Sequence, residues 1–257
     1  MIKISLTQKV REIYAKYNFR ASPVLDQFFI INKGVIERVV RYANVNKNDI
    51  ILEVGPGLGF LTKEIAEKAG KVIAIERDKK LIPVLESELK DYDNVELIFK
   101  DVLKTKLPKF NKIVSNIPYS ISAPLSEKLL NYDFELAVLF FQKEFGYRMI
   151  KKPGQEGYGR LSVMAQHYNE VEVKETVPRD AFYPQPKVDS VIVLLKRKKE
   201  VTKDDKFNLL VKEIFRYKNK TVKNAVKIAF NKNIEDERKV RTLKDEDLME
   251  LIKQVMD

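Results

Sequence analysis

The chain has 257 residues, 44% of which are hydrophobic, and a formal net charge of +11. That length and hydrophobic content exclude an intrinsically disordered chain and allow one large domain, or a domain with an appendage. The sequence contains no cysteine, which excludes disulfide bonds, thiolate catalysis and cysteine-ligated metal centres. The positive charge favours a polyanionic partner such as nucleic acid, although a basic protein without such a partner could carry it too.

Membrane and metalloproteins are also disfavoured. No apolar run approaches the roughly 18–20 residues that cross a bilayer, and the N-terminal MIKISLTQKVREIYAKY has no apolar core of signal-peptide length. We therefore expect a cytoplasmic protein that does not bind a membrane. The single His167 cannot form a multi-histidine metal site, so we expect no metal, and its place in RLSVMAQHY predicts a helix residue with a packing role.

Strand-like and helix-like segments alternate along most of the chain. The predicted strands are DIILEV (49–54), KVIAIE (71–76), NVELIF (94–99), NKIVS (111–115) and FELAVLFF (134–141), and helical spacing covers 60–69 and 79–90. Near-continuous apolar strands joined by helices predict a parallel sheet that is covered on both faces. Two later segments, 170–177 and 188–198, are expected to close the sheet as an antiparallel pair.

The pattern changes near residue 200. Residues 203–257 have helical periodicity and no strand pattern, and the charged run KRKKE (196–200) is a plausible domain boundary. We therefore predict an α/β domain over residues 1–200, with an N-terminal helical segment, and a small helical domain over 201–257.

A glycine-rich turn follows the first long strand. ILEVGPGLGF (51–60) places Gly55, Gly57 and Gly59 between a strand and a helix, where glycine lets the backbone turn tightly and approach a ligand closely. The spacing is G-x-G-x-G, whereas the dinucleotide fingerprint is G-x-G-x-x-G, so an NAD-binding enzyme is disfavoured. By itself the turn could equally be structural.

Polar residues follow the next strands at equivalent positions. Glu76 ends the second strand, Asp101 follows the third in FKDVL, and Asn116 follows the fourth. Each alone could be a solvated charge or turn. The carboxyl ends of strands in an open α/β sheet form one ligand crevice, so these residues and the glycine turn should converge there. Glu76 could accept from ribose hydroxyls and Asp101 from an adenine amine, which predicts an adenosine ligand without a pyrophosphate.

The stretch SNIPYSIS (115–122) supplies a second kind of chemistry. Asn116 offers a carbonyl oxygen that can accept from an amine, Pro118 stiffens the turn, and Tyr119 offers a flat face for base stacking. If the ligand is S-adenosylmethionine, acceptors out of the plane of a base would make its exocyclic amine more tetrahedral and stabilise the charge that develops there. The alternative is a proline turn that ends a strand.

Seven motifs together make the chain resemble the KsgA/Dim-type small-subunit rRNA adenine dimethyltransferases of the rRNA adenine N(6)-methyltransferase family. They are EVGPGLGFLT, IE at 75–76, KDVL, SNIPYSISAPL, QKEFGYRM, YGRLSVMAQ and FYPQPKVDSVIV. The resemblance implies a Rossmann-like S-adenosylmethionine-dependent methyltransferase sheet with a small C-terminal helical domain that binds RNA. It also implies dimethylation of two adjacent adenosines in the 3′-terminal hairpin loop of small-subunit rRNA, on an assembling pre-30S-type particle.

Site residues follow from the motifs that match. The resemblance implies cofactor contacts at Phe28, Ile30, Gly55, Gly57, Glu76, Asp101 and Asn116. It implies that Asn116, Pro118 and Tyr119 hold the target adenine and that Phe182 stacks on its other face. One motif departs from the family pattern of Gly-Gln-Asn/His-Phe-Leu. Here it is DQFFI, in which Asp26 replaces the glycine and Phe28 the polar residue.

Basic residues outside this site predict contacts with RNA phosphates, although any one of them could equally lie on a solvated helix face. They are Arg148, Lys151, Lys152, Lys196, Arg197, Arg216, Lys218, Lys220 and Lys223. Two alternatives remain: an Erm-type large-subunit rRNA adenine methyltransferase, and a non-catalytic ribosome-assembly factor with the same fold. SAPL, YGRLSV and Asp189 favour the small-subunit enzyme over the Erm type. We expect a monomer.

Overall fold

The computed structural model describes residues 5–199 and 201–256. The chain divides into two compact units. The first comprises Met1–Lys143 and Val173–Lys196, and the second comprises Glu144–Glu172 and Arg197–Asp257. None of the helices in the described ranges has both the length and the apolar character that a bilayer crossing requires.

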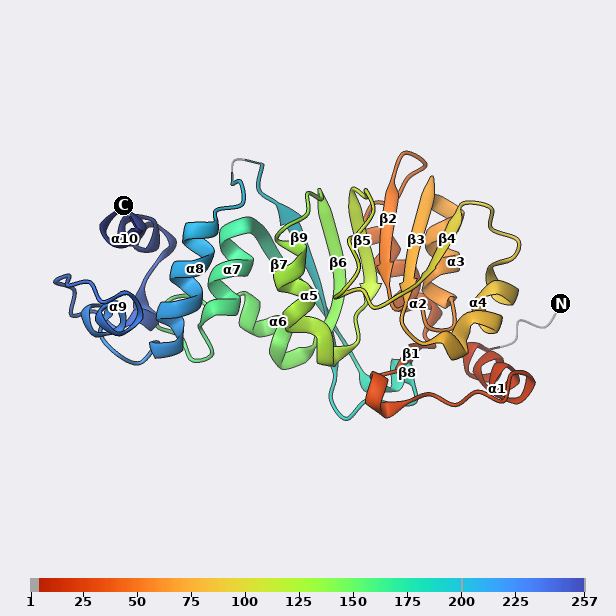
Figure 1. The fold of residues 1–257 in the computed structure, drawn as a ribbon. Coiled ribbons are helices and arrows are strands. Elements are labelled where there is room, and N and C mark those ends of the chain that lie inside the picture. The colour runs from red at the N-terminus through yellow and green to blue at the C-terminus, as the bar shows by residue number, and fades with distance from the viewer. Residues whose placement is uncertain (1–4, 200, 257) are drawn as a thin grey trace. The chain divides into compact units, whose positions relative to one another are not determined.

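A seven-stranded sheet, most of which belongs to the first unit, has the strand order β4-β3-β2-β5-β6-β9-β7 (Figure 1). Its strands are β2 (Ile50–Val54), β3 (Lys71–Glu76), β4 (Val95–Phe99), β5 (Lys112–Asn116), β6 (Leu136–Gln142), β7 (Asn169–Val177) and β9 (Ser190–Arg197). Neighbours among β2 to β6 pair in parallel, and β9 pairs antiparallel with β6. The seven predicted strands are therefore confirmed within about two residues at each end.

Helices cover this sheet on both faces. Consecutive strand residues point to opposite faces, yet Ile51 and Leu52 of β2 are both fully buried. The helices of this unit are α1 (Leu6–Lys16), α2 (Lys33–Tyr42), α3 (Phe60–Lys68), α4 (Ile82–Leu89) and α5 (Ser122–Leu129). One apolar cluster contains α2 and α3, and another contains α1 and α4. The predicted parallel sheet with two covered faces is thus confirmed.

A second, very short sheet lies beside the first and was not predicted. β1 (Phe29–Ile30) pairs antiparallel with β8 (Phe182–Tyr183), so that Ile30 lies opposite Phe182. Ile31 also donates a backbone hydrogen bond to the carbonyl oxygen of Ala181 (2.8 Å). The pairing joins the DQFFI and FYPQPKVDS motifs, which are more than 150 residues apart in the sequence.

The second unit is helical, with α8 packed against α7, α9 and α10. Its helices are α6 (Lys143–Met149), α7 (Arg160–Tyr168), α8 (Asp205–Ile214), α9 (Val222–Phe230) and α10 (Asp245–Met256). His167 is buried, stacks on Phe207 with ring centroids 3.7 Å apart, and has Nδ1 2.8 Å from Asp245 Oδ1. This is the packing role expected from its sequence context.

The division into units differs from the predicted boundary. Residues 144–172, including α7 and most of α6, pack with the C-terminal helices, whereas the sequence pattern places them in the first domain. The boundary residue itself, 200, lies outside the described residues. The apolar face of α7 includes His167 and Tyr168, whose rings contact Phe207 of α8. Because these contacts join segments far apart in the sequence, the periodicity of 144–172 does not indicate which unit this segment packs with.

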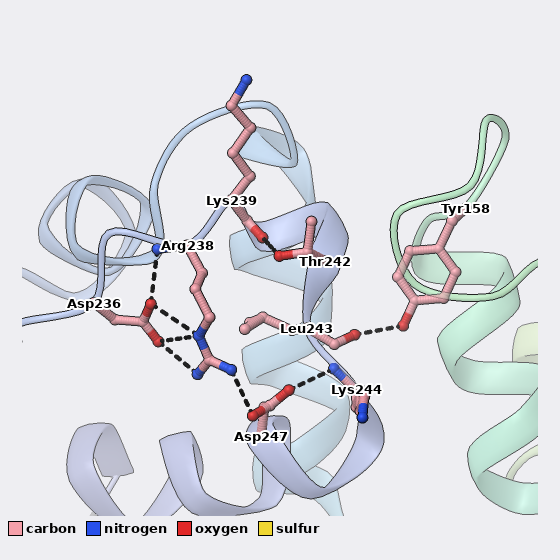
Figure 2. Close-up of polar contacts among 8 residues, drawn as sticks. All are labelled: Tyr158, Asp236, Arg238, Lys239, Thr242, Leu243, Lys244 and Asp247. Carbon is pink, nitrogen blue, oxygen red and sulfur yellow. Dashed lines mark hydrogen bonds and ion pairs between the residues drawn. The ribbon is translucent and has the colours of Figure 1, made fainter.

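Side-chain contacts hold the irregular segment between α9 and α10 (Figure 2). The Arg238 guanidinium donates to Asp236 (2.8 Å) and to Asp247 (2.7 Å), and Asp247 accepts from the Lys244 backbone N–H (2.8 Å). The Tyr158 hydroxyl donates to the Leu243 carbonyl oxygen (2.8 Å) and is buried. Burial raises the pKa of Tyr158, and the negative charge of Asp245 adds to the effect.

Replacing Tyr158 by phenylalanine is expected to lower the free energy of unfolding by about 1–3 kcal/mol, because it leaves the buried Leu243 carbonyl without its donor. Urea denaturation of the two proteins measures the difference. Tyr147→Phe is a matched control, because Tyr147 lies 38% exposed on α6 and its hydroxyl should contribute within about 0.5 kcal/mol. Equal losses in both variants would contradict the role given to the Tyr158 hydrogen bond.

Candidate active site

One cavity collects the residues that follow the parallel strands. It is lined by the glycine turn after β2, the ends of β3 and β5, the loop after β4, and the segment 24–30. All seven residues predicted to contact a cofactor line it: Phe28, Ile30, Gly55, Gly57, Glu76, Asp101 and Asn116. The predicted convergence at the carboxyl ends of the strands is therefore observed, and the contacts with a cofactor stay a prediction.

The glycine turn has a backbone conformation that larger residues would not tolerate. Gly55 and Gly57 have φ of +71° and +59°, in the left-handed region that favours glycine. A Cβ atom on Gly57 would lie 2.8 Å from the Phe29 ring, which is too close for any side chain. The turn therefore exposes bare backbone to the cavity.

Glu76 is held rigidly beside this turn. One carboxylate oxygen accepts from the backbone N–H groups of Arg77 and Asp78 (both 2.8 Å), and the other lies 3.4 Å from the Gly57 nitrogen. Burial raises the pKa of Glu76, and these three hydrogen bonds oppose the rise. Because a carboxylate has about four acceptor positions, lone pairs remain for hydroxyl groups of a ligand.

Asp101 lies on the adjoining wall and is more exposed. One oxygen accepts from the Leu103 N–H (2.9 Å), and the other is 3.9 Å from Nε of Arg77. Its side chain is 23% exposed. The carboxylate is thus oriented by the backbone that follows it and can still accept from an amine.

Asn116 ends β5 at the same cavity, and its amide has a defined orientation. Nδ2 donates to the backbone carbonyl oxygen of Phe28 (2.8 Å). Because that partner can only accept, the amide nitrogen must face it, and Oδ1 is left as an acceptor. Pro118 lines the cavity as well, 3.5 Å from the Cβ position of Gly55. The donor side and the acceptor side of the predicted site are therefore adjacent.

Tyr119 does not line the cavity, but it adjoins it through Phe28. The two ring centroids are 5.6 Å apart and the rings are tilted by 31°. The Tyr119 hydroxyl shares a hydrogen bond with Ser190 Oγ (2.6 Å). Burial raises the pKa of Tyr119, and the bond with Ser190 opposes the rise. One face of Tyr119 is thus covered by an aromatic ring.

Phe182, which is predicted to stack on a target base, lies in the apolar core of the first unit. Phe182 is 1% exposed, belongs to the same apolar cluster as α2 and α3, and packs edge-on against Phe140 with centroids 6.1 Å apart. Bringing the ring to a ligand would require it to leave the core, at a cost of roughly 1.5–3 kcal/mol for a fully buried side chain. In this structure Phe182 is a core residue, and its stacking on a target base stays a prediction.

The Asp26 departure from the family glycine has a structural explanation. Asp26 has φ of +50°, a conformation that glycine adopts freely and that aspartate tolerates better than most residues. Its Oδ2 accepts from the Ser120 backbone N–H (2.7 Å), directly after Tyr119. The carboxylate thus ties the segment 24–30 to the Asn116–Tyr119 turn, which a glycine could not do.

Glu53 is a candidate that our sequence analysis missed. It lines the cavity on β2, is 1% exposed, and its Oε2 has no hydrogen-bond partner within the described residues. Burial raises its pKa to about 8, opposed by the Thr62 hydroxyl and reinforced by the charge of Glu76. An acid inside an otherwise apolar strand, two residues before the glycine turn, was the available signal. A buried carboxyl group with one oxygen left unpartnered fits a cationic group of a ligand.

The basic residues predicted to contact RNA are mostly exposed. Arg148, Lys152, Lys196, Arg216, Lys218 and Lys220 are exposed, whereas Lys151, Arg197 and Lys223 are half-buried. Arg216 pairs with Glu213 (2.9 Å), a surface ion pair that a phosphate could readily replace. Arg197 instead lies over the Tyr168 ring, 4.9 Å from its centroid, and is the least available of the nine. Their contacts with RNA stay a prediction.

Comparisons with known proteins agree with this geometry. Residues 18–256 match the family model described as ribosomal RNA adenine dimethylase. A probable ribosomal RNA small subunit methyltransferase A from Thermococcus sibiricus is 46% identical over 226 residues, which cover 87% of this chain and 81% of the relative. The ribosomal RNA small subunit methyltransferase A of Thermotoga maritima is 39% identical over 246 residues, covering 95% and 88%.

Solved structures with the same fold support this family assignment. A dimethyladenosine transferase from Plasmodium falciparum superposes with a TM-score of 0.79 at 31% identity, covering 88% of this chain and 96% of that one. The 23S rRNA methyltransferase ErmE superposes with a TM-score of 0.68 at 27% identity, covering 89% and 100%. The predicted Rossmann-like methyltransferase fold is therefore confirmed. With 239 of its residues inside the matching model (18–256), the chain belongs to the ribosomal RNA adenine dimethylase family.

Proposed function

We propose that this protein uses S-adenosylmethionine to dimethylate the exocyclic amines of two adjacent adenosines in the 3′-terminal hairpin loop of small-subunit rRNA. The observation that carries the proposal is that the glycine turn and the Asn116–Pro118 corner line the same cavity. A donor against Gly55 would therefore lie beside an amine held by Asn116. Family membership and the small-subunit enzymes among the relatives support the substrate.

The polar groups of the cavity fit S-adenosylmethionine. Glu76 would accept from the ribose hydroxyls, Asp101 from the adenine amine, and Glu53 from the ammonium group, which would supply the partner that Glu53 Oε2 lacks. When bound, S-adenosylmethionine supplies an electrophilic methyl group. At Gly57 the Phe29 ring leaves no space for a Cβ atom, so only glycine fits at this point of the cavity wall.

The acceptor corner would activate a poor nucleophile. The lone pair of an adenine amine is delocalised into the ring, so the amine must become more tetrahedral to react. Asn116 Oδ1, fixed by the bond from Nδ2 to Phe28, and a backbone carbonyl of the turn would accept its two N–H groups. These fixed acceptors would then stabilise the positive charge that develops on nitrogen. The methylated amine is acidic enough to lose its proton to water, so no general base is required.

We expect the substrate to be an assembling small-subunit particle, because the predicted target is a hairpin loop from which bases can be extruded and stacked. The exposed basic residues of the helical unit, among them Lys218 and Lys220, would contribute phosphate contacts that weaken with salt. The protein is expected to act as a monomer in the cytoplasm.

The test is mass spectrometry of rRNA fragments after purified particles react with the protein and S-adenosylmethionine. We expect two methyl groups on each of two adjacent adenosines in the 3′-terminal fragment of small-subunit rRNA. Large-subunit particles serve as a parallel substrate, and methylation confined to them would decide for an Erm-type enzyme. Absence of measurable affinity for S-adenosylmethionine would decide for a non-catalytic assembly factor.

Replacing Tyr119 by alanine is expected to raise KM for the particle by about 5- to 150-fold, because base–aromatic stacking contributes roughly 1–3 kcal/mol. Tyr119→Phe keeps the ring and loses only the hydroxyl bond to Ser190, so its KM should stay near the wild-type value. Steady-state and single-turnover kinetics measure both variants. Unchanged single-turnover rates in Tyr119→Ala would refute the stacking role.

A further inference from the structure

The pairing between β2 and β5, which are neighbours in the sheet (Figure 1), ends before the edge that carries the cavity. Their register ends where Leu52 lies opposite Ile113. On their other sides both strands stay paired further along, β2 with β3 as far as Val54 and β5 with β6 as far as Asn116. The sheet therefore opens between β2 and β5, at the point where its strand order reverses and a ligand crevice is expected.

The side chain of Ser115 bridges the two strands where they separate. Its Oγ donates to the Val54 carbonyl oxygen (2.6 Å) and accepts from the Val54 N–H (3.2 Å). The next residue, Gly55, donates its N–H to the carbonyl oxygen of Ile75 in β3 (2.9 Å), so the backbone groups of Val54 point the other way, towards β5. In a continued parallel ladder they would bond to the backbone of β5, whereas here one hydroxyl group satisfies both.

This bridge is one residue away from both halves of the candidate site. Val54 is followed directly by Gly55 of the glycine turn, and Ser115 is followed directly by Asn116. Gly55 and Asn116 both line the cavity, whereas Ser115 is fully buried and cannot touch a substrate itself. A hydroxyl group fits between two strands only where they stand further apart than the ~4.8 Å of a ladder. The Ser115 hydroxyl therefore holds the two strands apart at this point.

We propose that Ser115 is a positioning residue, whose hydroxyl sets the distance between the glycine turn and Asn116, and thereby the distance between the methyl donor and the target amine. The inference rests on the proposed function. Transfer requires the two reacting atoms to lie about 3–3.5 Å apart, and a misplacement of about 1 Å can cost roughly 100-fold in rate. Without the hydroxyl, the backbone groups of Val54 must bond to β5 or to water, and either change alters the separation of the strands.

Ser115→Ala removes the bridge, and Ser162→Ala in the second unit is a matched control. Ser162 is also fully buried, and its Oγ donates to the Arg148 carbonyl oxygen (2.6 Å) and accepts from the Gly159 N–H (3.3 Å). The two variants lose equivalent hydrogen bonds, so urea denaturation should show similar losses of stability. Ser115→Cys keeps a weaker donor and acceptor at the same position.

The experiment measures the single-turnover rate of methyl transfer with saturating S-adenosylmethionine and small-subunit particle, at a temperature at which all variants are folded. Ser115→Ala should lower this rate about 10- to 100-fold. Ser115→Cys should lie between it and the wild type, and Ser162→Ala should keep the wild-type rate. The Kd of S-adenosylmethionine, measured by calorimetry, should change far less than the rate in Ser115→Ala, because wrong spacing affects the transition state more than the bound donor.

Three results would overturn the inference. A wild-type rate in Ser115→Ala would refute the role of Ser115 and leave the proposed function intact. Equal losses of rate in Ser115→Ala and Ser162→Ala would mean that the rate follows the stability of the protein and not the spacing of the strands. A wild-type protein that methylates no particle would refute the proposed function, and the role of Ser115 with it.

Discussion

Replacing Asn116 by alanine is expected to lower turnover by about 100- to 1000-fold, the usual loss when one fixed polar group at a developing charge is removed. The loss should appear in kcat more than in the affinity for S-adenosylmethionine, because Oδ1 accepts from the target amine and its contribution grows as charge develops. Single-turnover rates measure the effect on methyl transfer, and calorimetry measures the affinity for the cofactor.

A second variant separates the two roles of the Asn116 amide. Asn116→Asp keeps an oxygen where Oδ1 lies, but it replaces the Nδ2–H bond to the Phe28 carbonyl by a second oxygen and adds a negative charge. It should retain a larger share of turnover than Asn116→Ala. Equal losses would indicate that the bond to Phe28, and not the acceptor oxygen, supports activity. Turnover near the wild-type value in Asn116→Ala, together with a collapse of cofactor affinity, would refute the acceptor role altogether.

Patterns within a strand or helix allowed the main sheet to be predicted. The run KVIAIE coincides with β3, and FELAVLFF begins two residues before β6. These strands could be predicted because an apolar run is a local property of the chain. The site followed from the same information. Once the sheet is parallel, Glu76, Asp101 and Asn116 must lie at one edge, and they line one cavity.

The sequence did not reveal contacts that depend on long-range pairing. The β1–β8 ladder has only two residues in each strand, too few for a periodic pattern. It is this ladder that holds Phe182 opposite Ile30 in the core, and a motif match cannot indicate which way an aromatic ring points. The hydrogen bond from Ser120 to Asp26 could not be predicted either, because the two residues are far apart in the sequence. The sequence showed only that Asp26 departs from the family motif.

Glu53→Gln is expected to weaken the binding of S-adenosylmethionine about 30-fold or more, because truncating one member of a buried charge pair costs roughly 2–5 kcal/mol.

The pH dependence of the affinity for S-adenosylmethionine tests the role of Glu53 more directly. The pKa of Glu53 is about 8 in the free protein, and the carboxylate must be ionised to pair with the ammonium group. Wild-type affinity should therefore rise by up to about tenfold per pH unit towards pH 8 and then level off.

Calorimetry in buffers of different ionisation enthalpy counts the protons released on binding. Near pH 7 the wild type should release about one proton more than Glu53→Gln, since Glu76 and the ligand's own groups are common to both. The same proton count in the two proteins, or an unchanged Kd in Glu53→Gln, would contradict the assignment of Glu53 to the ammonium group.

The same carboxyl group should make the free protein less stable than its glutamine variant, opposite to its effect on binding. In the unfolded chain Glu53 loses its proton near its ordinary pKa of 4.5, whereas in the folded protein it keeps the proton up to about pH 8. The free energy of unfolding of the wild type should therefore fall, relative to Glu53→Gln, as the pH rises between these values, by roughly 3 kcal/mol at pH 7.

Urea denaturation of both proteins at pH 5 and pH 8 without ligand measures this difference in the free energy of unfolding. A variant that binds S-adenosylmethionine more weakly yet unfolds at higher urea would show that Glu53 contributes to ligand binding at the expense of stability.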